Sequence, residues 1–207
     1  MSRTPQKRQR ALTPRGRATR QKIIEAAAAL VYAAGAARLN LDEVMAASRT
    51  SKSQLYHYFA DKEALIQEVI AFQTKRVLTV NSDHLETIDS LQALRRWRDD
   101  LIDRNRAVGG FGGCPIGSLA DELANHSPPS RKRLANSFEA WASRIENALR
   151  TMKAKGLLKA STEPKELSLA VLAAIQGGLL LAKVSRTSRP LEIAFDMALD
   201  HVARCAT

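Results

Sequence analysis

Apolar residues in the first eighty positions recur at the three- and four-residue spacing that places them on one face of a helix. Polar breaks divide this pattern into short segments, and Gly35 ends the first of them. The pattern predicts four helices, at about 23–34, 41–45, 52–59 and 61–80. A tight turn at Ser48–Ser51 separates the second helix from the third, which is typical of a helix-turn-helix unit.

The rest of the chain repeats the helical spacing over longer segments. A glycine-rich loop at 108–115 interrupts it, and prolines open several of the expected helices. These helices are expected at about 91–102, from Pro115 to before Ser127, from about 138 to Gly156, at 164–184 and at 190–205. Since no stretch alternates with the two-residue period of a strand, the predicted fold class is all-α, with an N-terminal three-helix helix-turn-helix domain and a C-terminal helical domain.

The segment Leu167–Ala182 carries no charged side chain and is strongly apolar. It is shorter than the roughly 20 residues that a bilayer-spanning helix needs, and Ser168 and Gln176 interrupt it. A helix buried between partners is the better interpretation, so we expect no membrane partner.

Positive charge is concentrated at the N-terminus. The formal net charge is +11, and residues 1–22 hold eight lysines or arginines and no acidic residue. With Pro5, Pro14 and Gly16 in it, the segment 1–18 is expected to be a basic flexible arm, because it cannot bury enough surface to fold alone. Charge alone leaves two interpretations open, contact with nucleic-acid phosphates and a solubilising tail.

The two cysteines, Cys114 and Cys205, cannot form a framework of disulfides, which fits a reducing compartment. The basic start of the chain leads into no apolar segment of the kind that secretory signals contain. The expected location is therefore the cytoplasm, in association with the nucleoid.

The most specific motif is the run Leu55-Tyr-His-Tyr-Phe-Ala-Asp-Lys-Glu-Ala-Leu65, which follows Ser51-Lys-Ser-Gln54. It resembles the recognition helix, and the start of the next helix, of the TetR family of transcriptional regulators. The resemblance extends from about Thr19 to Ile70. It implies a DNA-binding domain at 19–66, an effector-binding and dimerisation domain at 67–207, and a repressor that binds a palindromic operator as a homodimer.

The chemistry of these residues agrees with a DNA contact. Ser51 can cap the recognition helix, and Lys52, Ser53 and Gln54 lie on its first turn, from which a major-groove helix reads base edges. By resemblance, Tyr56 and His57 contact the DNA backbone or a nearby base. The residues expected at DNA are Arg20, Asn40, Ser51, Lys52, Ser53, Gln54, Tyr56, His57 and Lys62.

The run Tyr56-His-Tyr-Phe59 has a second interpretation, an ordinary aromatic cluster in a core. That would explain Tyr58 and Phe59, of which Phe59 together with Leu55 is expected to face inward, but not two polar aromatic residues beside a lysine-containing turn. The chain also departs from the family in that turn, where Arg49 and Thr50 replace the usual Gly and Val. Arg49 is expected to carry a left-handed strain of ~1 kcal/mol, and the Thr50 hydroxyl must find a partner.

The C-terminal part resembles regulators of the LmrA/YxaF type, in segments at 113–123, 138–141, 174–182 and 189–191. Such regulators control efflux or detoxification genes and release DNA on binding small compounds, so the resemblance implies a small hydrophobic or aromatic effector. It also implies a homodimer interface on 165–184 and 190–205. The expected ligand-binding residues are Trp97, Phe111, Cys114, Phe138, Trp141 and Ile175, although the aromatic ones also fit an ordinary core.

Cys114 has two interpretations. Because Pro115 follows it, Cys114 is expected at a helix N-terminus, whose dipole lowers the pKa of a thiol. The alternative function of the chain is thus a thiol-based sensor of electrophiles or oxidants. In the other interpretation Cys114 is an inert small residue beside the ligand cavity.

No combination of residues indicates an enzyme, a cofactor or a metal site. The histidines at 57, 84, 126 and 201 are scattered, and there is no phosphate-binding loop, zinc motif or serine elbow. Glu122 and His126 lie four apart without a third ligand, so a solvated helix face is expected. Two rival classes stay open: a thiol catalyst built from Cys114 and His126, and a sequence-blind binder of nucleic acid or membrane surfaces.

Overall fold

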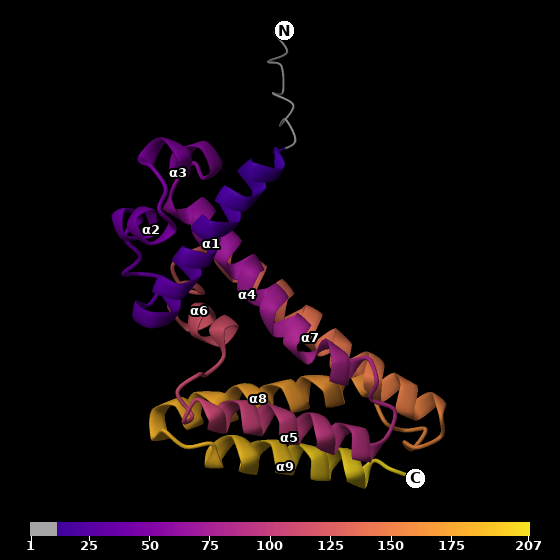
Figure 1. The fold of residues 1–207 in the computed structure, drawn as a ribbon. Coiled ribbons are helices and arrows are strands. Elements are labelled where there is room, and N and C mark those ends of the chain that lie inside the picture. Colours follow the sequence, from indigo (N-terminus) through magenta and orange to yellow (C-terminus); the bar gives the residue numbers. More distant parts are fainter. Residues whose placement is uncertain (1–11) are drawn as a thin grey trace, which may run out of the picture.

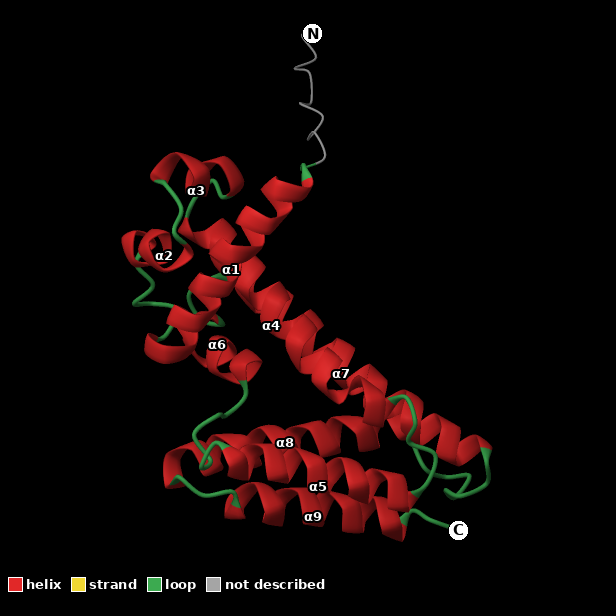
Figure 2. Cartoon of the chain, in the orientation of Figure 1, coloured by secondary structure: helices red, strands yellow, loops and turns green. Residues whose placement is uncertain are grey.

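The computed structural model describes residues 12–207, and this part of the chain is helical apart from its connections (Figure 1 and Figure 2). Its helices are α1 (Pro14–Ala34), α2 (Leu41–Ser48), α3 (Lys52–Tyr58), α4 (Lys62–Leu85), α5 (Leu91–Ala107), α6 (Pro115–Leu123), α7 (Pro128–Ala154), α8 (Pro164–Ser185) and α9 (Arg189–Arg204). Between residues 12 and 207 no strand forms, and Leu158 and Ala206 make an isolated antiparallel bridge. The all-α prediction is confirmed.

Helices α1, α2 and α3 form a unit that packs on the first half of α4 (Figure 1). Its core consists of fully buried apolar side chains, among them Ile23, Ala27, Val44, Leu55, Leu65 and Val69. Burial of such side chains is the main favourable term in folding. The helix-turn-helix predicted from apolar spacing is therefore present, with its helices held by a common core.

Helix α1 begins earlier than its apolar pattern indicates. The Thr13 hydroxyl accepts a hydrogen bond from the Gly16 N–H at 3.1 Å, and Pro14 occupies the first turn, where its missing N–H costs nothing. The prediction of a flexible arm over 1–18 is therefore wrong for residues 14–18, which are helical. Apolar spacing could not detect a turn made almost wholly of polar and charged residues. Residues 1–11 lie outside the described part of the chain.

Helix α4 spans 24 residues and runs from the helix-turn-helix to the C-terminal helices (Figure 1). Asp61 caps its start by accepting from the Ala64 N–H at 2.7 Å, and the helix continues past the expected end near Val80 to Leu85. Helix α7 packs along it, and the Thr74 and Ser137 hydroxyl oxygens lie 2.8 Å apart between the two. One continuous helix thus contributes to both ends of the molecule.

Helix α7 also begins earlier than expected. Ser127 caps it by accepting from the Ser130 N–H at 3.2 Å, and Pro128 is its first residue. The segment Ser127-Pro-Pro-Ser130 was predicted as a break between helices. It is instead a cap and a first helical turn, a position that proline favours.

Helices α5, α8 and α9 lie at the end of the molecule opposite α3 (Figure 2), and α9 contacts both of the others. A side chain at Gly178 of α8 would place its Cβ 2.8 Å from the Leu191 Cα of α9, so glycine permits this close approach. Helix α5 also contacts α9: the Trp97 ring of α5 packs edge-to-face on Phe195 of α9, with 5.1 Å between the ring centroids. The three helices form the base of the C-terminal domain.

Within residues 12–207, α8 alone is long and apolar enough to cross a membrane by length and composition. About 44% of its apolar window is buried inside the chain, where it packs on α7 and α9. A core helix of a water-soluble protein has the same properties, so this helix is weak evidence for a membrane.

Glu63, on the first turn of α4, connects that helix to the start of α7. Its carboxylate accepts hydrogen bonds from the hydroxyls of Ser127 at 2.7 Å and Ser130 at 3.0 Å, and from the Gln67 amide at 2.8 Å. The bond from Ser127 is the main cause that lowers the pKa of Glu63 below its usual value of 4.5, against an opposing effect of burial. A lowered pKa in the folded state stabilises the fold above the unfolded-state pKa, and this contribution is lost as pH falls through the folded-state pKa.

We therefore expect Glu63→Gln to reduce the free energy of unfolding at pH 7 by about 1 kcal/mol, because the charge-assisted hydrogen bonds weaken. The difference from the parent chain should shrink as pH falls below the usual glutamate value of about 4.5. Chemical denaturation at several pH values measures it. Glu139→Gln on the exposed face of α7 is the control, with no change expected. An equally large difference at pH 7 and pH 3.5 would contradict the assignment.

Candidate DNA interface and effector cavity

Helix α3 begins with a reciprocal pair of hydrogen bonds. The Ser51 hydroxyl accepts from the Gln54 N–H at 3.2 Å, and the Gln54 side-chain oxygen accepts from the Ser51 N–H at 2.9 Å. This capping box satisfies two backbone donors that a helix start leaves open. Asn40 caps α2 in a similar way through the Asp42 N–H at 2.8 Å. Ser51, Gln54 and Asn40, all expected at DNA, therefore also fix the two helices of the motif.

The turn between α2 and α3 accommodates both unusual residues. Arg49 has φ of 54° and ψ of 46°, the left-handed conformation that glycine adopts most cheaply, as expected. The Thr50 hydroxyl lies 2.7 Å from that of Ser48, which donates to the Val44 carbonyl at 2.7 Å. Thr50 therefore has its polar partner, and the turn keeps its shape without the usual glycine and valine.

The two faces of α3 differ sharply in exposure. Leu55 and Phe59 are 0% and 2% exposed and pack inward, as predicted. The opposite face is exposed to solvent and carries the polar side chains Lys52, Ser53, Gln54, Tyr56 and His57. The interpretation of this aromatic run as an ordinary core cluster therefore fits Phe59 and the half-buried Tyr58, but not the exposed Tyr56 and His57. Tyr56, 47% exposed, is available to a partner outside the chain.

Two basic residues expected at DNA, Arg20 and Lys62, make contacts within the chain. Arg20 pairs with Glu68 at 2.7 Å, and its guanidinium lies 5.4 Å from the Phe59 ring centroid. Lys62 donates to the Ala37 carbonyl at 3.1 Å. Both side chains stabilise the three-helix unit on α4, and their contact with DNA stays a prediction.

Two basic residues that were assigned only to the arm lie next to the recognition helix. Arg15 and Arg17 are exposed on the first turn of α1, and a Cβ at Gly16 between them would lie 3.3 Å from the Tyr58 hydroxyl of α3. The pair Thr13-Pro14, a capping residue followed by a proline, was the sequence signal for this helix start. The exposed face of α3 is thus extended by positive charge from α1.

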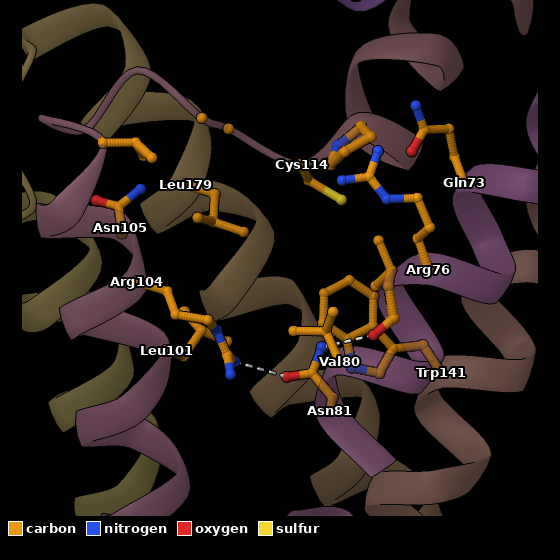
Figure 3. A pocket seen from close by; sticks show the side chains of 15 residues that line it. Gln73, Arg76, Val80, Asn81, Leu101, Arg104, Asn105, Cys114, Trp141 and Leu179 are labelled. Carbon is orange, nitrogen blue, oxygen red and sulfur yellow. Dashed lines mark hydrogen bonds between the residues drawn. The ribbon is translucent and has the colours of Figure 1, made fainter. Parts of the chain in front are cut away.

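The C-terminal domain contains a cavity of about 200 Å³, whose walls come from α4, α5, α7, α8 and the loop before α6 (Figure 3). Much of its wall is apolar, including Val77, Leu101 and Leu179. Of the six residues expected to bind a ligand, Cys114 and Trp141 line it. This cavity is the candidate effector site.

The other four expected residues lie elsewhere. Trp97 is 0% exposed, and its indole N–H donates to the Asn81 side-chain oxygen at 2.9 Å. Ile175 is fully buried in the core, and Phe111 is exposed with the Arg186 guanidinium 4.2 Å from its ring. Phe138 lines a separate surface hollow beside α8. Sequence could not separate these positions, because a core aromatic and a cavity aromatic follow the same helical spacing.

Polar side chains of the cavity wall were missed. Gln73, Arg76 and Asn81 come from α4, and Arg104 and Asn105 come from α5 (Figure 3). A signal was present for some of them, because Gln73 and Asn105 occupy positions of the apolar face three or four residues after Ile70 and Leu101. A polar residue at such a position either has a buried partner or faces a cavity.

Cys114 caps α6 but is buried, with 8% of its surface exposed. Burial raises the pKa of the thiol, while backbone N–H groups of Gly117 and Ile116 and the Gln176 side chain lower it by less. The expectation that the helix N-terminus would lower this pKa is therefore wrong, because loss of solvation is the larger effect. A thiol of this kind has little thiolate at neutral pH and reacts slowly.

Glu122 also differs from its expected role. Its carboxylate accepts from the Ala36 N–H at 2.6 Å and from the Ala37 N–H at 3.3 Å, between α1 and α2. Helix α6 ends at Leu123, so His126 does not continue its face. Glu122 is therefore a contact between domains, and no group of three metal-binding side chains occurs in residues 12–207.

Two family models match the chain: "Bacterial regulatory proteins, tetR family" over residues 23–69, and "Transcriptional regulator LmrA/YxaF-like, C-terminal domain" over residues 90–197. The transcriptional regulator AcuR of Cereibacter sphaeroides is 30% identical over 178 residues, covering 83% of this chain and 79% of AcuR. The HTH-type transcriptional repressor DhaR of Mycobacterium sp. (strain GP1) is 25% identical over 173 residues, covering 84% and 86%. A TetR-family regulator from Cytophaga hutchinsonii has the same fold, with a TM-score of 0.82 at 18% identity over 96% of this chain and 99% of that one.

An exposed recognition helix, joined by one long helix to a domain with a cavity in its surface, is the architecture of a helix-turn-helix transcriptional regulator. The chain belongs to the TetR family of bacterial regulators, and its C-terminal domain is of the LmrA/YxaF-like kind. Both resemblances inferred from the sequence are confirmed.

Because Cys114 is buried, we expect its thiol to react slowly. At pH 7.5 we expect iodoacetamide to modify the half-buried Cys205 well before Cys114, and to modify both at similar rates in denaturant. Peptide mass spectrometry at successive times measures the two rates. Modification of Cys114 in the folded protein as fast as Cys205 would restore the reactive-thiol interpretation.

Proposed function

We propose that the chain is a homodimeric repressor that binds a palindromic operator through α3 and releases it when a small effector occupies the cavity. The observation that carries this proposal is the position of α4. Its first residue, Lys62, contacts the α1–α2 connection, and its later residues Gln73 and Val77 line the cavity. The name of DhaR, a repressor, supports the direction of regulation.

The exposed apolar surface of α8 and α9 supports a homodimer. Six large apolar side chains there are more than half exposed: Leu169, Leu180, Leu181, Val184, Ile193 and Met197. Those on α8 repeat at helical spacing along one stripe, and Gly177 on the same stripe leaves open space around its Cβ position. An apolar surface of this extent on a water-soluble protein marks an interface, and two-fold pairing buries the same surface on both chains.

Two contacts, at the two sides of α6, connect the C-terminal domain to the DNA-binding unit independently of α4. The Tyr32 hydroxyl of α1 donates to the Gly112 carbonyl at 2.7 Å, and Gly112 lines the cavity. At the other end of α6, Glu122 holds the backbone of Ala36. A ligand that displaces the loop before α6 therefore also displaces α1 relative to the C-terminal domain.

The proposed mechanism is a shift between two arrangements of the dimer. Effector binding moves α4 and α6, which changes the distance between the two recognition helices. Half-sites one helical turn apart require these helices about 34–36 Å from each other. A dimer with a different spacing no longer fits successive major grooves, and the operator is released.

Lys52→Ala should weaken operator binding by about 1–3 kcal/mol, roughly five- to 150-fold, because Lys52 is exposed on the first turn of α3. Gel shifts on the chain's own upstream DNA measure the loss. Lys132→Ala, the same change at an exposed position on α7, is the control and should bind normally. Mutation of one half-site should abolish the shift of the parent chain, whereas equal binding to unrelated DNA would refute a specific repressor.

Leu181→Asp should convert the dimer to a monomer, because a charge in the centre of the apolar stripe remains unpaired when the interface closes. Sedimentation velocity distinguishes one chain from two. Leu157→Asp is the matched control, since Leu157 is 39% exposed in the connection after α7, outside α8 and α9. A Leu181→Asp variant that remains dimeric would place the interface elsewhere.

A further inference from the structure

The cavity wall contains buried polar atoms without partners. Four buried side-chain atoms in residues 12–207 make no hydrogen bond, and three of them belong to the wall: Gln73 Oε1, Asn105 Oδ1 and Trp141 Nε1. Their residues are 3%, 5% and 2% exposed. A buried polar group without a partner destabilises a fold, so a molecule that enters the cavity and reaches these atoms through a small shift of the wall would supply hydrogen bonds that the chain itself does not. A purely hydrocarbon effector leaves all three unsatisfied.

The wall is also positively charged. Arg76 from α4 and Arg104 from α5 line it, and no aspartate or glutamate does. Arg104 is already paired with Asp100 and lies 3.3 Å from the Asn81 side-chain oxygen. Arg76 makes no ion pair within the described residues; its guanidinium lies 5.8 Å from the Phe72 ring centroid. In Figure 3 this guanidinium lies beside Cys114 and Gln73. The uncompensated charge of the cavity is therefore that of Arg76, at its exposed edge.

The cavity is open to solvent at an edge that includes Arg76 and Val80, and its volume sets the size of the part of a ligand that it can hold. A volume of about 200 Å³ is slightly larger than the ~150 Å³ of an apolar cavity that holds benzene. Val77, Leu101 and Leu179 add an apolar surface to the same wall. The cavity therefore suits one ring or a short hydrocarbon chain that carries one anionic group.

We propose that the effector is a small carboxylate, a monoanion whose carboxylate pairs with Arg76 and whose single ring or short chain packs on the apolar wall. This inference rests on the proposed function and specifies the class of its effector. A carboxylate suits Arg76 because a guanidinium presents parallel N–H donors to its two oxygens. A hydroxyl on the ligand's body would offer both a donor for Gln73 or Asn105 and an acceptor for Trp141.

Binding to the free dimer tests the proposal directly. Isothermal titration calorimetry with benzoate, 4-hydroxybenzoate and hexanoate should show saturable binding of at least one, and the neutral amide of that acid should bind at least tenfold more weakly. Arg76→Gln should reduce the affinity for the carboxylate at least tenfold and leave that for the amide unchanged. Arg95→Gln, at an exposed position of α5 outside the cavity, is the control and should bind as the parent does.

The carboxylate assignment and the proposed repressor can fail independently of each other. If the chain binds its operator but none of these acids binds, or if acid and amide bind equally, the carboxylate assignment is wrong and the repressor remains. Carboxylate binding that depends on Arg76 in a chain without a specific operator would support the cavity assignment and overturn the repressor. Release of the operator by the acid that binds, and not by its amide, would support both.

Discussion

The structure depends on one constraint: a single helix, α4, must pack against the DNA-binding unit at its start and form a wall of the cavity further along. A helix of 24 residues is about 36 Å long, so it reaches across both domains without a joint. Glu63 and Arg20–Glu68 fix its first turns, and Gln73, Arg76 and Val77 follow within about three turns. Because packed helices move as rigid bodies, a displacement at the cavity cannot remain local.

Helix α6 adds a second connection of a different kind. It is short, it begins at the cavity with Cys114, and it ends where Glu122 accepts backbone N–H groups between α1 and α2. Helix α4 connects the two domains through packing, whereas α6 connects them through a charge-assisted hydrogen bond. The Cys114 thiol at the start of α6 is part of the cavity wall, and its burial there raises its pKa.

Sequence reasoning predicted the helices, the helix-turn-helix and the exposed face of α3, because apolar spacing and a dense motif report local structure directly. It was incomplete where contacts between distant parts of the chain determine which side chains are buried or paired. It did not reveal that Arg20, expected at DNA, also pairs with Glu68. Trp97 was expected to bind the ligand, yet its indole N–H donates to Asn81 and its ring packs on Phe195. Burial raises the pKa of the Cys114 thiol, and the position of Cys114 at the start of a helix does not reveal that it is buried. For the polar part of the cavity wall, one indication was present in the sequence: Gln73 and Asn105 are polar residues at positions of apolar helix faces.

The most direct test of the account is the distance between the two recognition helices of the dimer. A spin label at Ser53→Cys, in a chain with Cys205→Ala, reports it by pulsed electron resonance, and Cys114 is too buried to be labelled. On operator DNA the account predicts a narrow distribution near the spacing of one helical turn, roughly 34–36 Å between helices. A saturating ligand of the cavity should shift that distribution. Operator release with an unchanged distance would contradict the proposed transmission through α4 and α6.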